Sequence, residues 1–194
     1  MKAGARKGGR ALEPWTVLGT TQVYSAPPWV TVSVDRVRLP DGRVIDDYRQ
    51  VTLPEFVVIF AQTPDGRVIV QRQYRHGVRA VTLTLPAGMR EPGEDPLACA
   101  QRELLEETGY ASDDWRPLGT FVPNGTYGCG TAHFFAARGV RRVAERATDD
   151  LEETEMLLLT VEELAAAIRD GGAVILSTVA VLALATHPLL APKP

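Results

Sequence analysis

The residues best suited to chemistry in this chain are three closely spaced glutamates, Glu103, Glu106 and Glu107. On a helix they would lie within one turn, with Cβ atoms roughly 5–6 Å apart. Carboxylates this close repel one another, so a positive partner is expected beside them. Arg102 can neutralise Glu106 at i,i+4, which would leave Glu103 and Glu107 facing outward with oxygens free. Because hard cations such as Mg²⁺ bind oxygen ligands and substrate phosphates, this face is predicted to hold metal; a solvated acidic face is the alternative.

The segment carrying these glutamates is predicted to be an amphipathic helix over residues 96–108. Asp95 can cap its first turn, Pro96 fits the first helical position, and Gly109 suits the left-handed position that ends a helix. Ahead of it, Leu85 to Gly88 indicates a strand that ends in a tight turn. An apolar stripe that can pack on a core recurs at helical spacing and consists of Leu97, Ala100, Leu104 and Thr108.

The string from Gly88 to Tyr110 resembles the Nudix box at every fixed position. It runs Gly88, five residues, Glu94, seven residues, Arg102-Glu103-Leu104, one residue, Glu106-Glu107, one residue, Gly109-Tyr110. The resemblance implies a hydrolase that acts on a nucleoside diphosphate linked to another group and uses Mg²⁺ or Mn²⁺. The implied fold class is α/β, a Nudix-like α/β/α sandwich with a mixed sheet.

The same resemblance implies roles for individual residues. Glu103 and Glu107 would be the main metal ligands, with Glu107 also catalytic. Glu106 would assist them, and the backbone carbonyl of Ala87 would be a further ligand. Two other residues of the box would hold its loop and helix in place, Glu94 and Arg102.

Two stretches before the box narrow the resemblance to the ADP-ribose and nucleotide-sugar pyrophosphatases. They are Val70 to Arg75 and Leu83 to Gly88. In that group an arginine at the position of Arg75 contacts the diphosphate, which a guanidinium fork suits; an arginine in solvent at a strand end is the alternative. The sequence departs from the group at Thr84, where these relatives commonly carry glutamate.

An acidic stretch, 149–155, precedes the apolar run 156–159. It resembles the loop that supplies a further glutamate, as base or metal ligand, in ADP-ribose pyrophosphatases. Register favours Glu152 as both catalytic residue and metal ligand, with Asp150 and Glu153 as substitutes. An acidic surface turn is the alternative.

The N-terminal part of the chain is expected to be a separate strand region. We place a disordered leader and antiparallel strands at 1–53, with a role in substrate contact or dimer formation, and the catalytic domain at 54–194. Relatives place an aromatic side chain from this region against the base and form homodimers. Trp29 is the candidate for stacking, with Tyr48 and Arg49 nearby in substrate binding; a Trp in plain core or interface is the alternative.

Composition excludes several other classes of protein. A net charge of −3 and a pI near 5.7 provide no basic field for nucleic acid. The longest apolar stretch, 173–185, is shorter than the roughly 20 residues of a spanning helix and is interpreted as a packed C-terminal helix, so no membrane partner is expected. Two cysteines form no disulfide framework, and the basic start 1–10 lacks an apolar secretory core, which favours a cytoplasmic location.

The leading hypothesis is a Mg²⁺-dependent pyrophosphatase that cleaves ADP-ribose or a related nucleoside diphosphate sugar to a nucleoside monophosphate and a sugar phosphate. A second reading keeps the chemistry but changes the substrate to an oxidised nucleoside triphosphate or a dinucleotide. A third is a nucleotide-binding regulator without turnover, against which the intact glutamates argue.

Overall fold

The structure is a computed structural model that describes residues 12–146 and 153–190. The chain divides into two compact units. Residues 1–53 and the loop 124–129 form the first unit, and residues 54–123 and 130–194 form the second. The first unit therefore takes in a loop that is far away in sequence.

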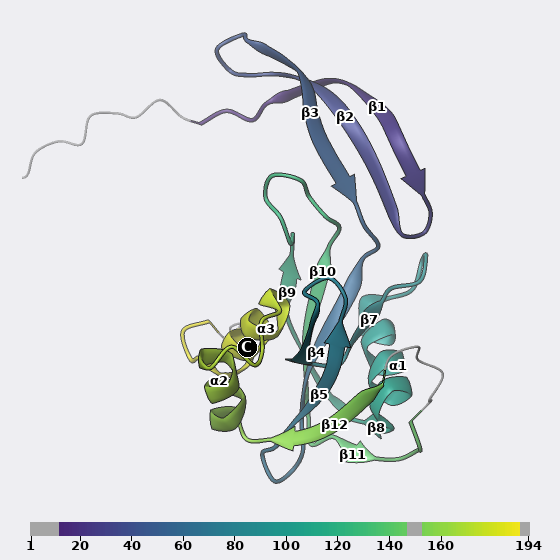
Figure 1. Ribbon diagram of the computed structural model, residues 1–194, viewed down its shortest axis with the longest axis vertical. Helices are drawn as coiled ribbons and strands as arrows, with labels where there is room; N and C mark the ends of the chain where they lie inside the picture. The colour runs from purple at the N-terminus through teal and green to yellow at the C-terminus, as the bar shows by residue number, and fades with distance from the viewer. Residues whose placement is uncertain (1–11, 147–152, 191–194) are drawn as a thin grey trace, which may run out of the picture. The chain divides into compact units, whose positions relative to one another are not determined.

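The first unit contains a three-stranded antiparallel sheet in the order β1-β2-β3 (Figure 1). Its strands are β1 (Thr16–Ala26), β2 (Val30–Arg38) and β3 (Val44–Thr52). The β2–β3 turn closes with a 2.9 Å bond from Gly42 N–H to the Leu39 carbonyl, and Gly42 has a φ of 88° that suits glycine. The loop 124–129 is tied to β3 because Val51 N–H donates to the Tyr127 carbonyl and Cys129 N–H donates to the Val51 carbonyl.

The second unit contains a seven-stranded mixed sheet. Its main path is β12-β5-β4-β10-β9, with β6 paired to β5 and β7 paired to β4. The β4–β10 pair is parallel and the other described pairs are antiparallel. The strands are β4 (Phe56–Gln62), β5 (Val68–Arg75), β6 (Ala80–Thr84), β7 (Ala87–Met89), β9 (Asp114–Phe121), β10 (Ala132–Arg138) and β12 (Thr154–Leu159). A short separate ladder joins β8 (Tyr110–Ala111) to β11 (Arg141–Arg142).

Three helices cover the two faces of this sheet (Figure 1). They are α1 (Pro96–Thr108) on one face, and α2 (Val161–Arg169) and α3 (Leu176–Thr186) on the other. One core joins Leu104 of α1 to Ile59 of the sheet, and a second joins Leu164 and Val181 to Val58. The predicted α/β/α sandwich with a mixed sheet and an N-terminal antiparallel sheet is confirmed.

The first helix has the ends that its sequence predicts. The Asp95 carboxylate accepts from the N–H groups of Leu97 and Ala98, and Gly109 takes the left-handed conformation with a φ of 75°. These contacts satisfy end groups that the helix itself leaves unpaired.

Two details differ from the sequence analysis. The C-terminal helix begins at Leu176 rather than near residue 173, because residues 172–174 bond to β6: Leu83 N–H donates to the Gly172 carbonyl and Val174 N–H to Thr82 Oγ1. The strand before the box is two strands, β6 and β7, that pair with different neighbours on either side of Leu85-Pro86. Among the described residues no helix is both long and apolar enough to cross a membrane.

Candidate active site

Arg102 ties the acidic loop to the acidic helix. Its Nε and Nη2 atoms donate to the two Glu94 carboxylate oxygens at 2.9 and 3.0 Å, and Nη2 also reaches the Met89 carbonyl at 3.2 Å. Its Nη1 atom donates to Glu103 at 2.8 Å and to Glu106 at 3.1 Å. Forked contacts of this kind are the stronger class of charged hydrogen bond. The hydrogen bonds from Arg102 lower the pKa of Glu94 to about 2, so this brace is charged at neutral pH.

The Arg102 contacts correct one expectation. We expected Arg102 to neutralise Glu106 and leave Glu103 outward and unengaged, but its guanidinium reaches both carboxylates. The Glu103 side chain is 13% exposed, and burial raises its pKa despite the nearby arginine. One cation shared among three carboxylates leaves this cluster negative, which is the electrostatic condition that a bound cation would relieve.

Gly88 allows Glu103 to lie against the backbone of β7. A Cβ atom added at Gly88 would sit 1.9 Å from Cδ of Glu103, closer than real atoms approach. The glycine is therefore needed here for space rather than for an unusual backbone angle. Any larger residue at position 88 would displace the carboxylate.

Glu107 is held against the same strand. Its Oε2 atom accepts from Ala87 N–H at 3.0 Å and from Gln71 Nε2 at 3.2 Å. The backbone groups of Gly88, and of every second residue on either side of it, face β4. The N–H and carbonyl of Ala87 therefore both point away from β4, toward the side that Glu107 occupies. The Ala87 carbonyl thus lies on the same side of the strand as the Glu107 carboxylate.

These groups fit a hard divalent cation. Glu103, Glu107 and the Ala87 carbonyl offer oxygen donors only, which is the set that Mg²⁺ prefers, and Mg²⁺ usually takes one or two carboxylates plus water and substrate phosphate. Within residues 12–146 and 153–190 no three His, Cys, Asp or Glu side chains are grouped to hold a metal ion. A metal here would need oxygens from the backbone, water or substrate phosphate in addition to the two glutamates.

A cavity of about 300 Å³ brings three of the residues from the sequence analysis together: Arg75, Thr84 and Ala87. Its other walls are mostly apolar, from Phe56 and Val58 of β4 and from Leu85 between β6 and β7, together with Ser177 and Thr178 of α3. The two α3 residues were not predicted from sequence, because a long stretch of chain separates them from the box and they share this cavity with Ala87 only through the fold.

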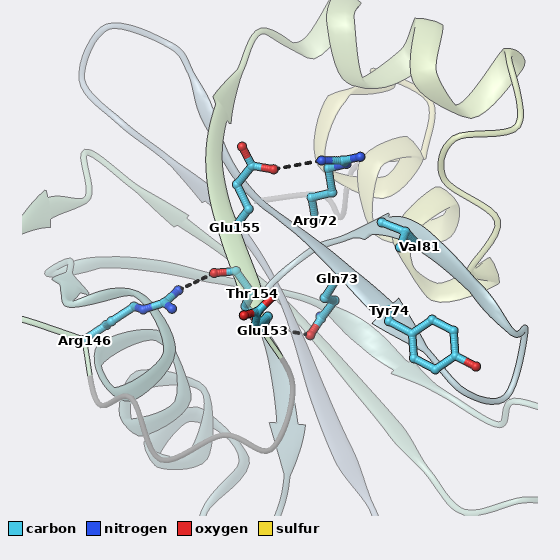
Figure 2. Close-up of a pocket in the computed structure, with 8 residues that line it drawn as sticks. All are labelled: Arg72, Gln73, Tyr74, Val81, Arg146, Glu153, Thr154 and Glu155. Carbon is cyan, nitrogen blue, oxygen red and sulfur yellow. Dashed lines mark hydrogen bonds and ion pairs between the residues drawn. The ribbon is translucent and has the colours of Figure 1, made fainter.

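A second and larger cavity, about 710 Å³, lies beside β5 and the start of β12 (Figure 2). Its walls include Arg72, Gln73, Tyr74, Arg146, Glu153 and Thr154. Arg72 pairs with Glu155 at 3.1 Å, and Arg146 donates to the Thr154 carbonyl at 2.7 Å. Of the candidates for the additional acid, Glu153 lines this cavity, whereas Glu152 and Asp150 lie outside the described residues.

The three candidates for substrate contact in the N-terminal region belong to the first unit. Trp29 is 63% exposed in the turn before β2, so it is not a core residue. The Tyr48 hydroxyl donates to the Thr126 carbonyl at 3.2 Å, and its ring meets Trp15 edge-on with centroids 5.5 Å apart. Arg49 pairs with Asp47 at 3.2 Å. Their role in binding stays a prediction.

One polar cluster escaped the sequence analysis. Glu55 accepts from Arg90 Nε at 2.9 Å and lies 3.0 Å from His133 Nε2. The hydrogen bond with His133 lowers the pKa of Glu55. The cluster anchors Arg90, which begins the loop of the box. Its members come from β10 and from positions beside β4 and β7, so no local spacing could reveal it.

Comparison with known proteins agrees with the fold. Residues 52–178 match the NUDIX domain, and residues 15–51 match the nucleoside diphosphate sugar hydrolase N-terminal domain. The α/β/α sandwich with an acidic, arginine-braced helix is thus of the Nudix class. The chain belongs to the Nudix family, and the prediction of a Nudix hydrolase is confirmed.

Three similar proteins illustrate the relationship. A methanol dehydrogenase activator from Bacillus methanolicus is 31% identical over 156 residues, which cover 80% of this chain and 83% of the relative. An ADP-ribose pyrophosphatase from Bacillus subtilis (strain 168) is 30% identical over 155 residues, covering 79% and 82%. A crystal structure of an ADP compounds hydrolase superposes with a TM-score of 0.77 at 22% identity, covering 90% of this chain and 93% of the other.

Proposed function

We propose that this protein hydrolyses the pyrophosphate bond of ADP-ribose or a related nucleoside diphosphate sugar, with Mg²⁺ as the metal, to a nucleoside monophosphate and a sugar phosphate. The observation that carries the proposal is the placement of the Glu103 and Glu107 carboxylates against Gly88 and Ala87. The name of the Bacillus subtilis relative, an ADP-ribose pyrophosphatase, supports the substrate class. Mn²⁺ is a second candidate for the metal, since it accepts the same oxygen ligands.

In this proposal each group of the chain has a defined task. Glu103, Glu107 and the Ala87 carbonyl would hold Mg²⁺, which when bound stabilises negative charge on phosphoryl oxygens. Arg75, which shares a cavity with Ala87, would orient the diphosphate through its planar fork. The brace from Arg102 to Glu94 would keep the carboxylates from shifting. Positioning and electrostatics account for most of the rate enhancement in reactions of this type.

A further carboxylate would remove the proton from the attacking water. We assign this task, and a share in metal binding, to Glu152, with Glu153 as the described alternative beside the larger cavity. Trp29 would stack on the base, with Tyr48 and Arg49 completing the substrate contacts. These assignments are hypotheses that single substitutions can separate, because loss of a base lowers kcat whereas loss of a stacking residue raises KM.

The substrate is tested with purified protein, Mg²⁺ and a panel of ADP-ribose, nucleotide sugars, dinucleotides and oxidised triphosphates. We expect AMP and ribose 5-phosphate from ADP-ribose at the highest kcat/KM. Glu107→Gln should lower kcat at least about 100-fold while the fold is retained, because one metal ligand is lost. The matched control is Glu162→Gln, which neutralises an exposed glutamate on α2. Equal turnover by Glu107→Gln and the parent would refute the metal assignment.

We also propose that the protein is a homodimer formed through the first unit. Large apolar side chains are exposed on its strands and turns, among them Val17, Val23, Tyr24 and Trp29. Burying such surface against a second copy would remove it from water. Light scattering should report twice the chain mass of 21.1 kDa, and Val23→Asp should shift it toward one chain. A parent that stays at one chain mass would refute the dimer.

A cytoplasmic location remains our proposal, which the free thiols Cys99 and Cys129 support.

A further inference from the structure

Two glutamines occupy core positions on the face of β5 that α1 covers. Ile69, Gln71 and Gln73 alternate along that face, with exposures of 0%, 3% and 6%. An aliphatic side chain at either glutamine would continue the core begun by Ile69. Burying an amide costs about 1–3 kcal/mol unless its hydrogen bonds are made, so these two polar residues are not explained by packing.

Hydrogen bonds link the two amides in one direction. Gln71 Nε2 donates to Glu107 Oε2 at 3.2 Å, so its Oε1 atom is left to accept, and Gln73 Nε2 donates to it at 3.4 Å. Gln73 Nε2 also donates to Thr84 Oγ1 at 2.8 Å. Because an ionised carboxylate only accepts, Glu107 determines which end of Gln71 faces it, and Gln71 in turn determines which end of Gln73 faces it.

Two hydroxyl groups on neighbouring strands hold Gln73, which is the end of this hydrogen-bonded series farther from Glu107. Thr84 of β6 is 5% exposed and accepts from Gln73, while Thr154 of β12 donates to Gln73 Oε1 at 3.3 Å. Figure 2 shows Gln73 beside Thr154 in the wall of the larger cavity. The amide of Gln73 is therefore held from β6 and β12 at once, which prevents it from rotating away from Gln71.

We propose that Gln71 is a positioning residue for Glu107, and that Gln73 and Thr84 hold Gln71 in the orientation that this requires. The inference rests on the proposed function, in which Glu107 is a metal ligand. Ala87 N–H and Gln71 Nε2 reach the same carboxylate oxygen, so together they fix the rotation of the carboxylate. Partners of this kind orient a ligand without touching the metal.

The proposal gives Thr84 a role. The resemblance drawn from the sequence implies glutamate at this position, and such a carboxylate would bring a further negative charge to the site. In this chain a neutral hydroxyl accepts the Gln73 hydrogen bond instead. Thr84 thus completes the chain of amides at the position where this sequence departs from the family pattern.

The first test is Gln71→Leu, which keeps the side-chain volume and removes the donor. We expect kcat for ADP-ribose to fall about 10- to 100-fold and the Kd for Mn²⁺, measured on the protein without substrate, to rise by a similar factor. KM should stay within about twofold, because in this proposal Gln71 acts through Glu107 and not on the substrate. The control is Gln62→Leu, which removes an amide that donates to the Gly66 carbonyl in the β4–β5 turn.

The outcomes separate this inference from the proposed function. Gln71→Leu with parental kcat and parental Mn²⁺ affinity overturns the inference. A parent that does not cleave ADP-ribose refutes the substrate, and the Mn²⁺ comparison then decides on Gln71 by itself.

A second pair of variants decides the matter if Gln71→Leu does not fold. Thr84→Val removes the hydroxyl that accepts from Gln73 and should lower kcat several-fold, on the order of the loss of one neutral hydrogen bond. Thr84→Ser keeps the hydroxyl and should restore most of the activity. Equal kcat and Mn²⁺ affinity for Thr84→Val, Thr84→Ser and the parent would overturn the proposal.

Discussion

The two sheets of this protein differ in what covers them. In the first unit Val37 is the single buried hydrophobic residue among those described, whereas the sheet of the second unit is buried between two cores, one under α1 and one under α2 and α3. Burial of apolar area is the main favourable term in folding. The second unit therefore buries most of the apolar area that stabilises this chain, and the first unit buries much less.

The candidate residues differ between the units in the same way. Glu103 and Glu107 are fixed by Arg102, Ala87 and Gln71, in or beside a covered sheet. Trp29 and Arg49 are exposed on the first unit. Chemistry requires groups held to a fraction of an ångström, which a packed sheet supplies. Recognition of a base can use exposed side chains that gain their contacts only when substrate binds. We therefore expect substitutions in the two units to have different effects.

The largest difference is expected in the free energy of unfolding after two truncations, one on the helix that covers the sheet of the second unit and one on an exposed strand of the first unit. Leu104→Ala empties a fully buried position of α1 and should lower the free energy of unfolding by about 2–5 kcal/mol. Val23→Ala, at a position 57% exposed on β1, should change it by less than about 0.5 kcal/mol at concentrations where the chain is monomeric. Urea unfolding followed by tryptophan fluorescence measures both. Similar losses for the two variants would contradict the comparison.

An added methyl group sharpens the contrast at the site itself. Gly88→Ala places a carbon on Glu103 and should cost about 1–3 kcal/mol through overpacking, together with most of the activity, since the carboxylate must move. Gly19→Ala is the counterpart in the first unit, where an added Cβ meets nothing within 4 Å. Thermal melts and turnover of the two variants measure the difference. A Gly88→Ala protein with parental activity would show that Glu103 need not lie against β7.

The smallest effect concerns the charge of the Arg102 brace. The pKa of Glu94 is lowered from 4.5 to about 2, so its contribution to stability is present above pH 4.5 and is lost as the pH falls toward 2. The parent should be more stable than Glu94→Gln by a constant amount from pH 7 to 5, and the gap should close below pH 4.5. Unfolding curves of both proteins across this range give the gap. A gap that is the same at pH 7 and pH 3 would contradict the assignment.

Much of the fold could be predicted from sequence because its signals are local. Asp95, Pro96 and Gly109 mark the ends of α1, and Thr160 with Glu163 forms the capping box that begins α2. The start of α3 was placed too early, because the bonds of residues 172–174 to β6 compete with helix and depend on a strand about 90 residues away. Apolar sequence alone does not carry that information.

The part of the candidate site that lies within one segment of the chain could be predicted from the sequence. Glu103 and Glu107 lie within a single helix, so their spacing can be read from the sequence. The resemblance to the Nudix box added Ala87, and the resemblance of the stretches before the box to ADP-ribose and nucleotide-sugar pyrophosphatases added Arg75. The roles of Gly88 and Gln71 depend on which strand lies beneath α1, so they emerged from contacts rather than from spacing. The sharing of Arg102 among several carboxylates was not predicted, because i,i+4 spacing identifies Glu106 alone. The contacts with Glu94 and Glu103 depend on how the loop and the helix pack.

The most direct test of the account is a crystal structure of the protein soaked with Mn²⁺, with data collected to reveal the anomalous signal of the metal. We expect a peak coordinated by the carboxylates of Glu103 and Glu107, beside the Ala87 carbonyl, and its loss in Glu107→Gln. A map in which the two carboxylates point apart with no ion between them would contradict the central claim.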